Sequence, residues 1–151
     1  MLQKFTPAWG TCLLLSICAL ASCTNAPTDD KAAIIALLEK ESASWRARDA
    51  QAHAECWQIR PYSRILVSTS EGKCFDVPVD AVVHPQPDQM GDGGKSFNSN
   101  YRFAIYTDNA WVSHEEVSIS PAGDSTFSHE IRMLEKVNGE WKMVGQSIHV
   151  E

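Results

Sequence analysis

Beyond residue 30, the hydrophobic residues follow two different periods along the chain. Between residues 31 and 48 they recur every three or four positions with charged residues between them, which predicts an amphipathic helix. Thr28 or Asp29 can cap this helix, and acidic residues in its first turn suit the helix dipole. A shorter helix is predicted for residues 50–57, with Asp49 as its N-cap. The longer helix needs a sheet or a partner to cover its apolar side.

From residue 62 onward, apolar and polar residues alternate, as they do in half-buried strands. Asn138-Gly139 between two alternating runs is a strong hairpin signal. Residues 80–96 hold several prolines and glycines, and we expect a long mobile loop there with at most one helical turn at its start. The predicted strands are residues 62–70, 74–79, 100–107, 110–119, 125–137 and 140–150.

The turn at residues 138–139 sets which side chains of the last two strands share a face. Counting back from a two-residue turn places Arg132 opposite Gly145 and puts polar residues of both strands on one side. The opposite side is mostly apolar. In one interpretation, the helices cover one face and a second copy of the protein covers the other. In a more specific one, a cavity between sheet and helix is lined by Glu130, Arg132, Ser147 and His149.

The preceding turn decides which further side chains join this face. If "PAGD" is a four-residue turn, Glu115 comes opposite Glu130. A change of one residue in that turn would replace Glu115 by His114 and Glu116. Two carboxylates beside one arginine can form an acid/base pair, and a structural ion-pair cluster is the alternative.

The N-terminus has the layout of a secretory signal, with one lysine before an apolar segment at residues 11–20. Leu20-Ala21-Ser22-Cys23 resembles a bacterial lipobox, and this resemblance implies cleavage before Cys23 and a lipid on its sulfur. An ordinary cleavage near Ala21 is the alternative. We expect a signal peptide at residues 1–22, a lipidated N-terminus and flexible spacer at 23–30, and the domain at 31–151.

Cleavage of this signal would change the charge and the cysteine count. It would leave 12 basic and 19 acidic residues with no basic cluster, which excludes nucleic acid and anionic headgroups as partners. Cys56 and Cys74 would remain, either as a disulfide worth about 3 kcal/mol or as buried free thiols. We expect an exported protein held at the bacterial cell envelope by the lipid on Cys23. Thr24 favours the outer membrane, because it is not the aspartate that retains many lipoproteins at the inner membrane.

The order of elements and two motifs resemble the nuclear transport factor 2-like superfamily, in particular its SnoaL-like proteins. The motifs are "RARDAQAHAECW", at the entry to the second helix, and "EIRMLEKVNGEWKM", in the penultimate hairpin. The resemblance spans about residues 31–151 and implies a cone-shaped α+β domain, with a curved mixed or antiparallel sheet wrapped on N-terminal helices. It also implies a pocket at the wide end and a homodimer through the outer sheet face. The family usually places a third helix over the pocket, where this chain has its loop.

Enzymes of this superfamily use carboxylic acids and histidines inside the cone for proton transfer, so the resemblance implies such roles for Glu130 and His149. Arg132 can hold an anionic ligand with its planar guanidinium. Tryptophans are either core residues or the walls of a cavity for a flat apolar ligand. The sequence shows no HExxH, CxxC or other complete metal-ligand set, and we expect neither metal nor cofactor. The pocket candidates are Trp57, Trp111, Glu115, Glu130, Arg132, Trp141, Ser147 and His149.

These features favour a lipid-anchored, dimeric domain of the cell envelope that binds a small apolar or anionic ligand or acts as an accessory module. A small-molecule enzyme of the isomerase, hydrolase or cyclase type is the first alternative. A structural dimeric partner module with a filled cone is the second. Unpaired Glu130, Arg132 and His149 in a cavity would favour the enzyme, whereas mutual pairing would favour the structural module.

Overall fold

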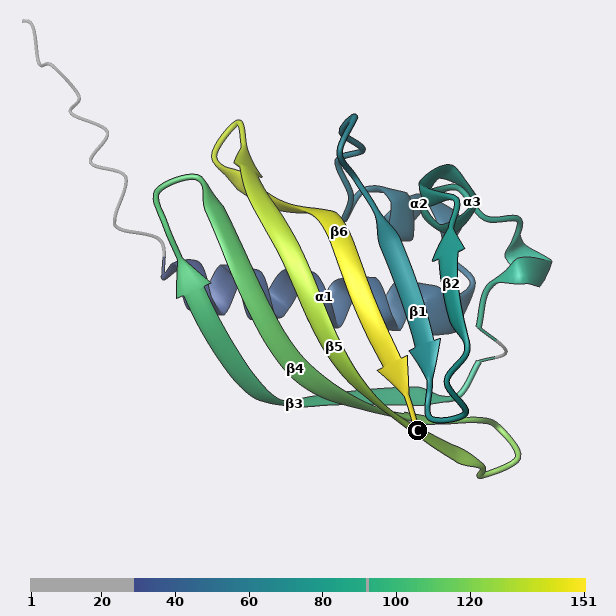
Figure 1. Ribbon diagram of the computed structural model, residues 1–151. Coiled ribbons are helices and arrows are strands. Elements are labelled where there is room, and N and C mark those ends of the chain that lie inside the picture. Colours follow the sequence, from purple (N-terminus) through teal and green to yellow (C-terminus); the bar gives the residue numbers. More distant parts are fainter. Residues whose placement is uncertain (1–28, 92) are drawn as a thin grey trace, which may run out of the picture.

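In a computed structural model, which describes residues 29–91 and 93–151, one long helix crosses one face of a curved sheet (Figure 1). The predicted lipidation site, Cys23, lies outside the described residues. None of the described helices is long and apolar enough to cross a membrane. The elements in chain order are α1 (Asp30–Ala47), α2 (Ala50–Ala54), β1 (Ile65–Thr69), β2 (Cys74–Val77), α3 (Val79–Val83), the 3-10 helix η1 (Pro87–Gln89), β3 (Lys95–Ile105), β4 (Asn109–Ile119), β5 (Ser125–Val137) and β6 (Glu140–Val150).

The strands form one sheet in the order β2-β1-β6-β5-β4-β3. Neighbouring strands are antiparallel except β1 and β6, which run parallel. Strands β3 to β6 are the predicted meander, and the β1–β2 hairpin extends the sheet beyond β6. The sheet curves around α1 without closing on itself (Figure 1). The predicted α+β class, with a curved mixed sheet wrapped on N-terminal helices, is therefore confirmed.

Both N-terminal helices begin at the residues that their capping signals indicate. Asp29 Oδ1 accepts hydrogen bonds from the backbone N–H groups of Lys31 and Ala32, at 3.1 and 3.4 Å. Asp49 Oδ1 accepts one from Ala52 N–H at 3.0 Å at the start of α2. Each side chain satisfies donors that lack an intrahelical partner, which stabilises a helix by about 1 kcal/mol.

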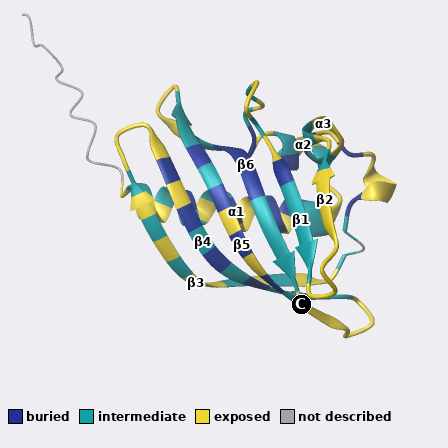
Figure 2. Ribbon diagram, viewed as in Figure 1, coloured by how far each residue is buried: buried dark blue, intermediate teal, exposed yellow. Residues whose placement is uncertain are grey.

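The core lies between α1 and the face of the sheet that packs on it, which we call the inner face (Figure 2). Ile34 and Leu38 of α1 are fully buried there, as are Val112, Leu134 and Met143 of the sheet. Each such side chain contributes roughly 1.5–3 kcal/mol by leaving water. Burial alternates along β4 and β5 (Figure 2), which is the pattern expected of strands with one covered face.

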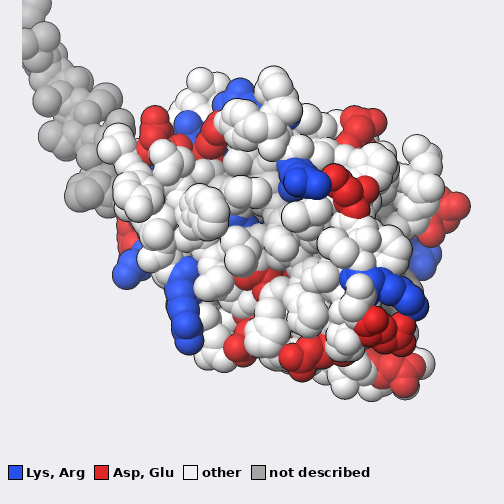
Figure 3. All heavy atoms as spheres, viewed as in Figure 1, with Lys and Arg blue, Asp and Glu red and all other residues white. Residues whose placement is uncertain are grey.

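The opposite side of the sheet, which we call the outer face, keeps large hydrophobic side chains in solvent. Trp111 is 58% exposed and Ile131 is 42% exposed. The space-filling view shows mostly uncharged side chains on this face, with a few acidic and basic ones among them (Figure 3). Two large hydrophobic side chains exposed on the same face make it a candidate interaction surface.

Residues 80–96 are more ordered than the predicted long loop. The predicted helical turn at the start of this segment is α3, and η1 and the first residues of β3 follow it. Val83 and Met90 are only 2% and 7% exposed, so apolar side chains attach this segment to the domain. Gly94 has a φ of +81°, and a Cβ there would lie 2.0 Å from the carbonyl oxygen of Ile119. The glycine thus permits a close backbone approach beside β3 instead of marking a loop.

A bulge in the last hairpin changes the predicted register of β6. Lys136 pairs with Trp141 as predicted, but the register shifts between Leu134 and Met133, and Arg132 then pairs with Gln146 instead of Gly145. One extra residue in a strand sends every later side chain to the other face. The prediction that Ser147 and His149 share the face of Arg132 is therefore wrong.

The turn between β4 and β5 also differs from the four-residue turn first considered. Ile119 pairs with Ser125, which leaves five residues between them, and Glu130 pairs with His114. The alternative register, with His114 and Glu116 in place of Glu115, is the one that the structure adopts. Glu115 instead pairs with His129 on the outer face.

Candidate functional site

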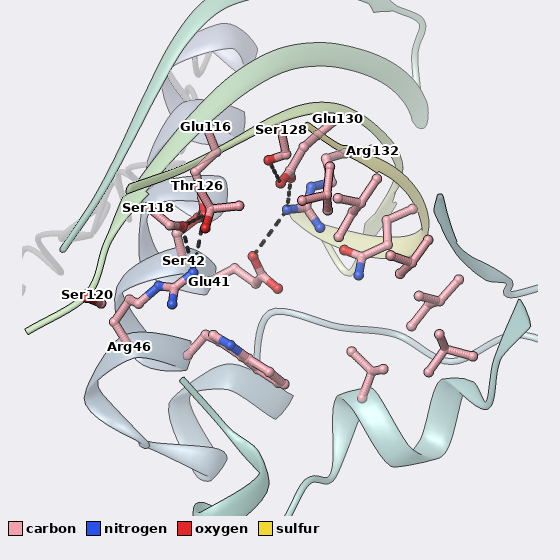
Figure 4. Close-up of a pocket in the computed structure, with 18 of the residues that line it drawn as sticks. Glu41, Ser42, Arg46, Glu116, Ser118, Ser120, Thr126, Ser128, Glu130 and Arg132 are labelled. Atoms are coloured by element: carbon pink, nitrogen blue, oxygen red, sulfur yellow. Dashed lines mark hydrogen bonds and ion pairs between the residues drawn. The ribbon is translucent and has the colours of Figure 1, made fainter. Parts of the chain in front are cut away.

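A cavity of about 530 Å³ lies between α1 and the inner face of the sheet, a volume typical of small-molecule sites. One side of the cavity is polar, with charged side chains from α1, β4 and β5 (Figure 4). The other side is apolar, with side chains from β1, β2, α3 and β6. The charged residues are Glu41, Arg46, Glu116, Asp124, Glu130 and Arg132, and the aliphatic ones are Ile65, Val67, Val77, Val82, Ile148 and Val150.

Arg132 and Glu130 form the buried ion pair of this cavity. They are two residues apart on β5, so their side chains point to the same face. Arg132 Nη2 donates to Glu130 Oε2, and Arg132 Nε donates to His114 Nε2 at 3.4 Å. Burial disfavours the charged guanidinium, but Glu130, Glu41 and Glu116 outweigh that effect and raise the pKa of Arg132. Arg132 therefore stays charged although it is only 3% exposed.

A second ion pair, between Arg46 and Glu116, lies next to the first. Arg46 Nη2 is 3.6 Å from Glu116 Oε1 and donates to Ser118 Oγ at 2.6 Å. Ser42 Oγ and Ser118 Oγ each donate to one oxygen of Glu116, at 2.8 and 2.6 Å. Burial alone would raise the pKa of Glu116, but the two serine hydroxyls and the arginines lower it below its ordinary value. Glu116 is therefore held as a carboxylate.

Glu41 differs from the other two glutamates because, among the described residues, no serine or arginine donates a hydrogen bond to its carboxyl group. Its Oε2 lies 3.7 Å from Arg132 Nη2, and its Oε1 lies 3.7 Å from His53 Nδ1. Burial outweighs the attraction of Arg132 and raises the pKa of Glu41 to about 7. A carboxyl group that titrates near neutral pH can give or take a proton in the cavity.

Of the eight predicted pocket residues, Glu130 and Arg132 line this cavity. Glu115, Ser147 and His149 lie on the outer face, together with Trp111. The bulge in β6 and the five-residue turn after β4 displace all four of them. His149 Nδ1 and Ser68 Oγ are 2.9 Å apart there.

The other two tryptophans among the predicted pocket residues belong to the core. Trp57 and Trp141 are 6% and 5% exposed, and the Trp141 indole N–H donates to Asp30 Oδ1 at 3.0 Å. Neither side chain lines the cavity, whereas Trp45 of α1 does. The interpretation of Trp57 and Trp141 as core aromatics is the one that fits.

Cys56 and Cys74 are both free thiols, so of the two alternatives the structure has the unbonded one, although only Cys56 is buried. Cys56 is buried just after α2, where its thiol donates to the Ala52 carbonyl at 3.3 Å. Cys74 is exposed at the start of β2, on the edge of the sheet. Burial raises the pKa of Cys56 to about 11, which leaves the thiol protonated and unreactive.

The sequence interpretation missed the residues that α1 contributes to the cavity, chiefly Glu41, Ser42 and Arg46. A signal was present for two of them, because Glu41 and Ser42 follow Ile34 by seven and eight positions and so lie on the apolar face of the helix. Polar residues on a face that must be buried are candidates for a site. Gln146 was missed because nothing in the alternating pattern reveals the bulge.

Within the two described ranges, no three His, Cys, Asp or Glu side chains are arranged to hold a metal ion. The cavity presents two ion pairs, several hydroxyl groups and the titrating carboxyl group of Glu41.

Three solved structures with a similar fold come from bacteria. The chain is similar to a protein of unknown function with a cystatin-like fold from Nostoc punctiforme, with a TM-score of 0.63, 16% identity, and coverage of 81% of this chain and 91% of that one. It is similar to an NTF2-like protein of unknown function from Silicibacter pomeroyi, with a TM-score of 0.62, 16% identity, and coverage of 83% and 99%. An NTF2-like protein from Cytophaga hutchinsonii gives a TM-score of 0.63 at 12% identity, with coverage of 82% and 99%.

These similarities assign the fold. No protein-family model matches the chain, and no curated protein does either. The structural neighbours confirm the predicted nuclear transport factor 2-like (NTF2-like) fold. Because folds of this kind carry many activities, function has to be argued from the cavity itself.

Proposed function

We propose that this chain is an exported, lipid-anchored NTF2-like domain that binds a small amphipathic molecule in the cavity beside α1. The observation that carries the proposal is the division of that cavity into a buried, charged side and an aliphatic side. Such a site suits a ligand with one polar end and an apolar body, because the polar end can contact the charged side chains while the apolar body contacts the aliphatic ones.

The pairing of the charged residues supports a binding function more than an enzymatic one. Glu130 and Arg132 are paired with each other, and Arg46 is paired with Glu116, so these four side chains form a fixed polar surface. Mutual pairing was expected of a structural module with a filled cone, but a cavity of about 530 Å³ beside the pairs argues against that alternative.

An enzyme is the second candidate, and Glu41 favours it. Its pKa is raised to about 7 by burial, which suits a general acid or base at neutral pH. His149, which had been the candidate histidine, lies outside the cavity, so Glu41 with His53 behind it would take the proton-transfer role.

The anchoring and the oligomeric state are further parts of the proposal. The lipobox-like residues that end at Cys23 support attachment to the cell envelope. The exposed Trp111 and Ile131 support a homodimer through the outer face, because a second copy would remove both from water.

Native mass spectrometry of residues 24–151, exported to a bacterial periplasm and purified without added ligand, tests the binding proposal. We expect a discrete bound mass that Val67→Trp removes, because Val67 lines the cavity and tryptophan would fill it. Leu66→Trp is the matched control, since Leu66 is the neighbour of Val67 on β1 and pairs with Ser147 on the outer face. A bound mass that survives Val67→Trp, or a wild-type protein without any, would contradict binding in this cavity.

A further inference from the structure

Glu41 lies between two buried nitrogen-bearing side chains at the polar side of the cavity. Its two carboxyl oxygens face different partners, with Oε1 at 3.7 Å from His53 Nδ1 and Oε2 at 3.7 Å from Arg132 Nη2. Figure 4 shows the Glu41 carboxyl group directed toward Arg132, next to Glu130. The carboxyl group is thus placed to respond to whatever binds at the guanidinium.

The hydrogen bond of His53 determines which of its nitrogens can accept a proton from Glu41. His53 Nε2 lies 3.0 Å from the carbonyl oxygen of Val82. A carbonyl can only accept, so Nε2 carries a hydrogen and the neutral ring presents a bare lone pair at Nδ1. Nδ1 is buried without any hydrogen-bond partner among the described residues. Glu41 Oε1 is the carboxyl oxygen that faces this nitrogen, and a proton on Oε1 would satisfy Nδ1 once their 3.7 Å separation shortens to hydrogen-bond length. Glu41 and His53 are therefore placed to share one proton.

Arg132 and Gln146 present unused hydrogen-bonding groups beside this pair. Arg132 Nη1 and Gln146 Oε1 are buried without partners among the described residues, and the two residues are directly opposite each other on β5 and β6. Both side chains line the cavity. An unpartnered buried donor is costly, and a guanidinium edge is the donor best matched to a carboxylate.

We propose, on the basis of the binding function above, that the ligand is an amphipathic carboxylate, and that its binding takes up a proton on the Glu41–His53 pair. The carboxylate would accept from Arg132, and its hydrocarbon body would lie against the aliphatic side of the cavity. The proton comes from solvent and the carboxylate ligand keeps its own charge, so the complex gains one negative charge and one positive charge.

The charges around Glu41 explain why a proton must accompany the ligand. Two arginines face the carboxylates of Glu130, Glu116 and Glu41, so with Glu41 ionised an added carboxylate would leave two uncompensated negative charges in the buried site, whereas a proton on Glu41 holds that excess at one. Burial already raises the pKa of Glu41 to about 7 and lowers that of His53. A bound carboxylate therefore needs to raise the pKa of Glu41 only a little further to keep it protonated at neutral pH. The charged and titratable groups that face Glu41 are His53 of α2, Arg46 of α1, Glu116 of β4, and Glu130 and Arg132 of β5.

Calorimetric titration of the purified domain tests the ligand class directly. The probes are octanoate and 2-naphthoate, each compared with its own carboxamide, which has the same shape without the charge. Titrations at pH 6, 7 and 8 in buffers of different ionisation enthalpy count the protons taken up. We expect one of the carboxylates to bind at least tenfold more tightly than its amide, with about half a proton taken up at pH 7 and nearly one at pH 8.

Variants assign the proton to this pair. In the wild type, the affinity for the carboxylate should fall up to about tenfold per pH unit above pH 7. In Glu41→Gln, the proton uptake should fall to zero and the affinity for the carboxylate should become independent of pH. Glu71→Gln, on an exposed turn, is the control and should behave as the wild type. Because proton uptake is measured on the wild type first, the test does not depend on how well a variant folds.

The possible results separate this inference from the proposed function. An amide that binds as tightly as its carboxylate, or carboxylate binding without proton uptake, would overturn the inference and leave cavity binding in place. If neither carboxylate binds the wild type, the inference also fails, and the Val67→Trp experiment decides on cavity binding by itself. Proton uptake that persists in Glu41→Gln would place the proton elsewhere and would likewise overturn it.

Discussion

The replacement Glu41→Gln tests whether folding raises the pKa of the buried Glu41 carboxyl group. The substitution keeps the shape of the side chain and removes its ability to ionise. In the folded protein, burial raises the pKa of Glu41 from 4.5 to about 7, whereas in the unfolded chain it returns to its ordinary value. Folded and unfolded states therefore bind different numbers of protons between pH 4.5 and 7.

The sign and size of the effect follow from that difference. Between the two pKa values the folded state holds the proton and the unfolded state does not, so the free energy of unfolding falls as pH rises. A shift of about 2.5 pH units corresponds to roughly 3 kcal/mol. Below pH 4.5 both states are protonated and the cost is absent, and above about pH 7 it is present in full. Glutamine never ionises, so it escapes this cost at every pH.

Urea denaturation of the wild type and Glu41→Gln from pH 4 to pH 8.5, followed by tryptophan fluorescence, measures the effect. We expect the variant to gain stability relative to the wild type by roughly 3 kcal/mol between pH 4 and pH 8, with most of the gain between pH 4.5 and 7. Contributions of other groups cancel in the comparison. Glu71→Gln, whose side chain is 71% exposed, should show no such trend.

Two results would refute the reasoning. A difference in stability that is the same at pH 4 and pH 8 would mean that the Glu41 pKa is not raised by folding. A variant that loses stability relative to the wild type as pH rises would mean that Arg132 holds Glu41 as a carboxylate, so that attraction outweighs burial.

Three further predictions concern the fold, the anchor and the outer face. In denaturant unfolding, Gly94→Ala should destabilise the protein by roughly 1–3 kcal/mol more than Gly72→Ala. Both glycines have positive φ, but only a Cβ at Gly94 would meet the Ile119 carbonyl, and equal losses of stability would contradict this. Cys23→Ala in the full chain should abolish incorporation of labelled fatty acid and release the protein from the membrane fraction of the producing bacterium, and unchanged fractionation would contradict lipid anchoring. Trp111→Glu should turn the expected dimer into a monomer in sedimentation analysis, since a buried unpaired carboxylate is costly; a wild type that is monomeric at high concentration would contradict the dimer itself.

Local signals in the sequence were sufficient for most of the secondary structure. Asp29 and Asp49 begin their helices by hydrogen bonds to residues two or three positions away, and such bonds depend on neighbours in the chain alone. The same is true of the turn at residues 138–139, which places β5 and β6 at their predicted bounds. The order of these elements also indicated the NTF2-like fold.

The composition of the cavity was decided by tertiary structure. Beside the bulge, Gly145 has no side chain, which lets the backbone of β6 approach Arg64 and the side chain of Met133, and these contacts come from other segments of the chain. Because one extra residue exchanges the two faces of a strand, it brings Gln146 into the cavity and moves His149 out of it.

The state of Glu41 shows the same division between sequence and structure. The sequence placed a glutamate on the apolar face of a helix and thereby ensured that it would be buried. Only the packing of α1 against β5 and α2 sets Arg132 and His53 on either side of its carboxyl group. Burial and these two neighbours together determine its pKa, because a carboxyl group responds to the dielectric and the charges around it in space, whatever their separation along the chain.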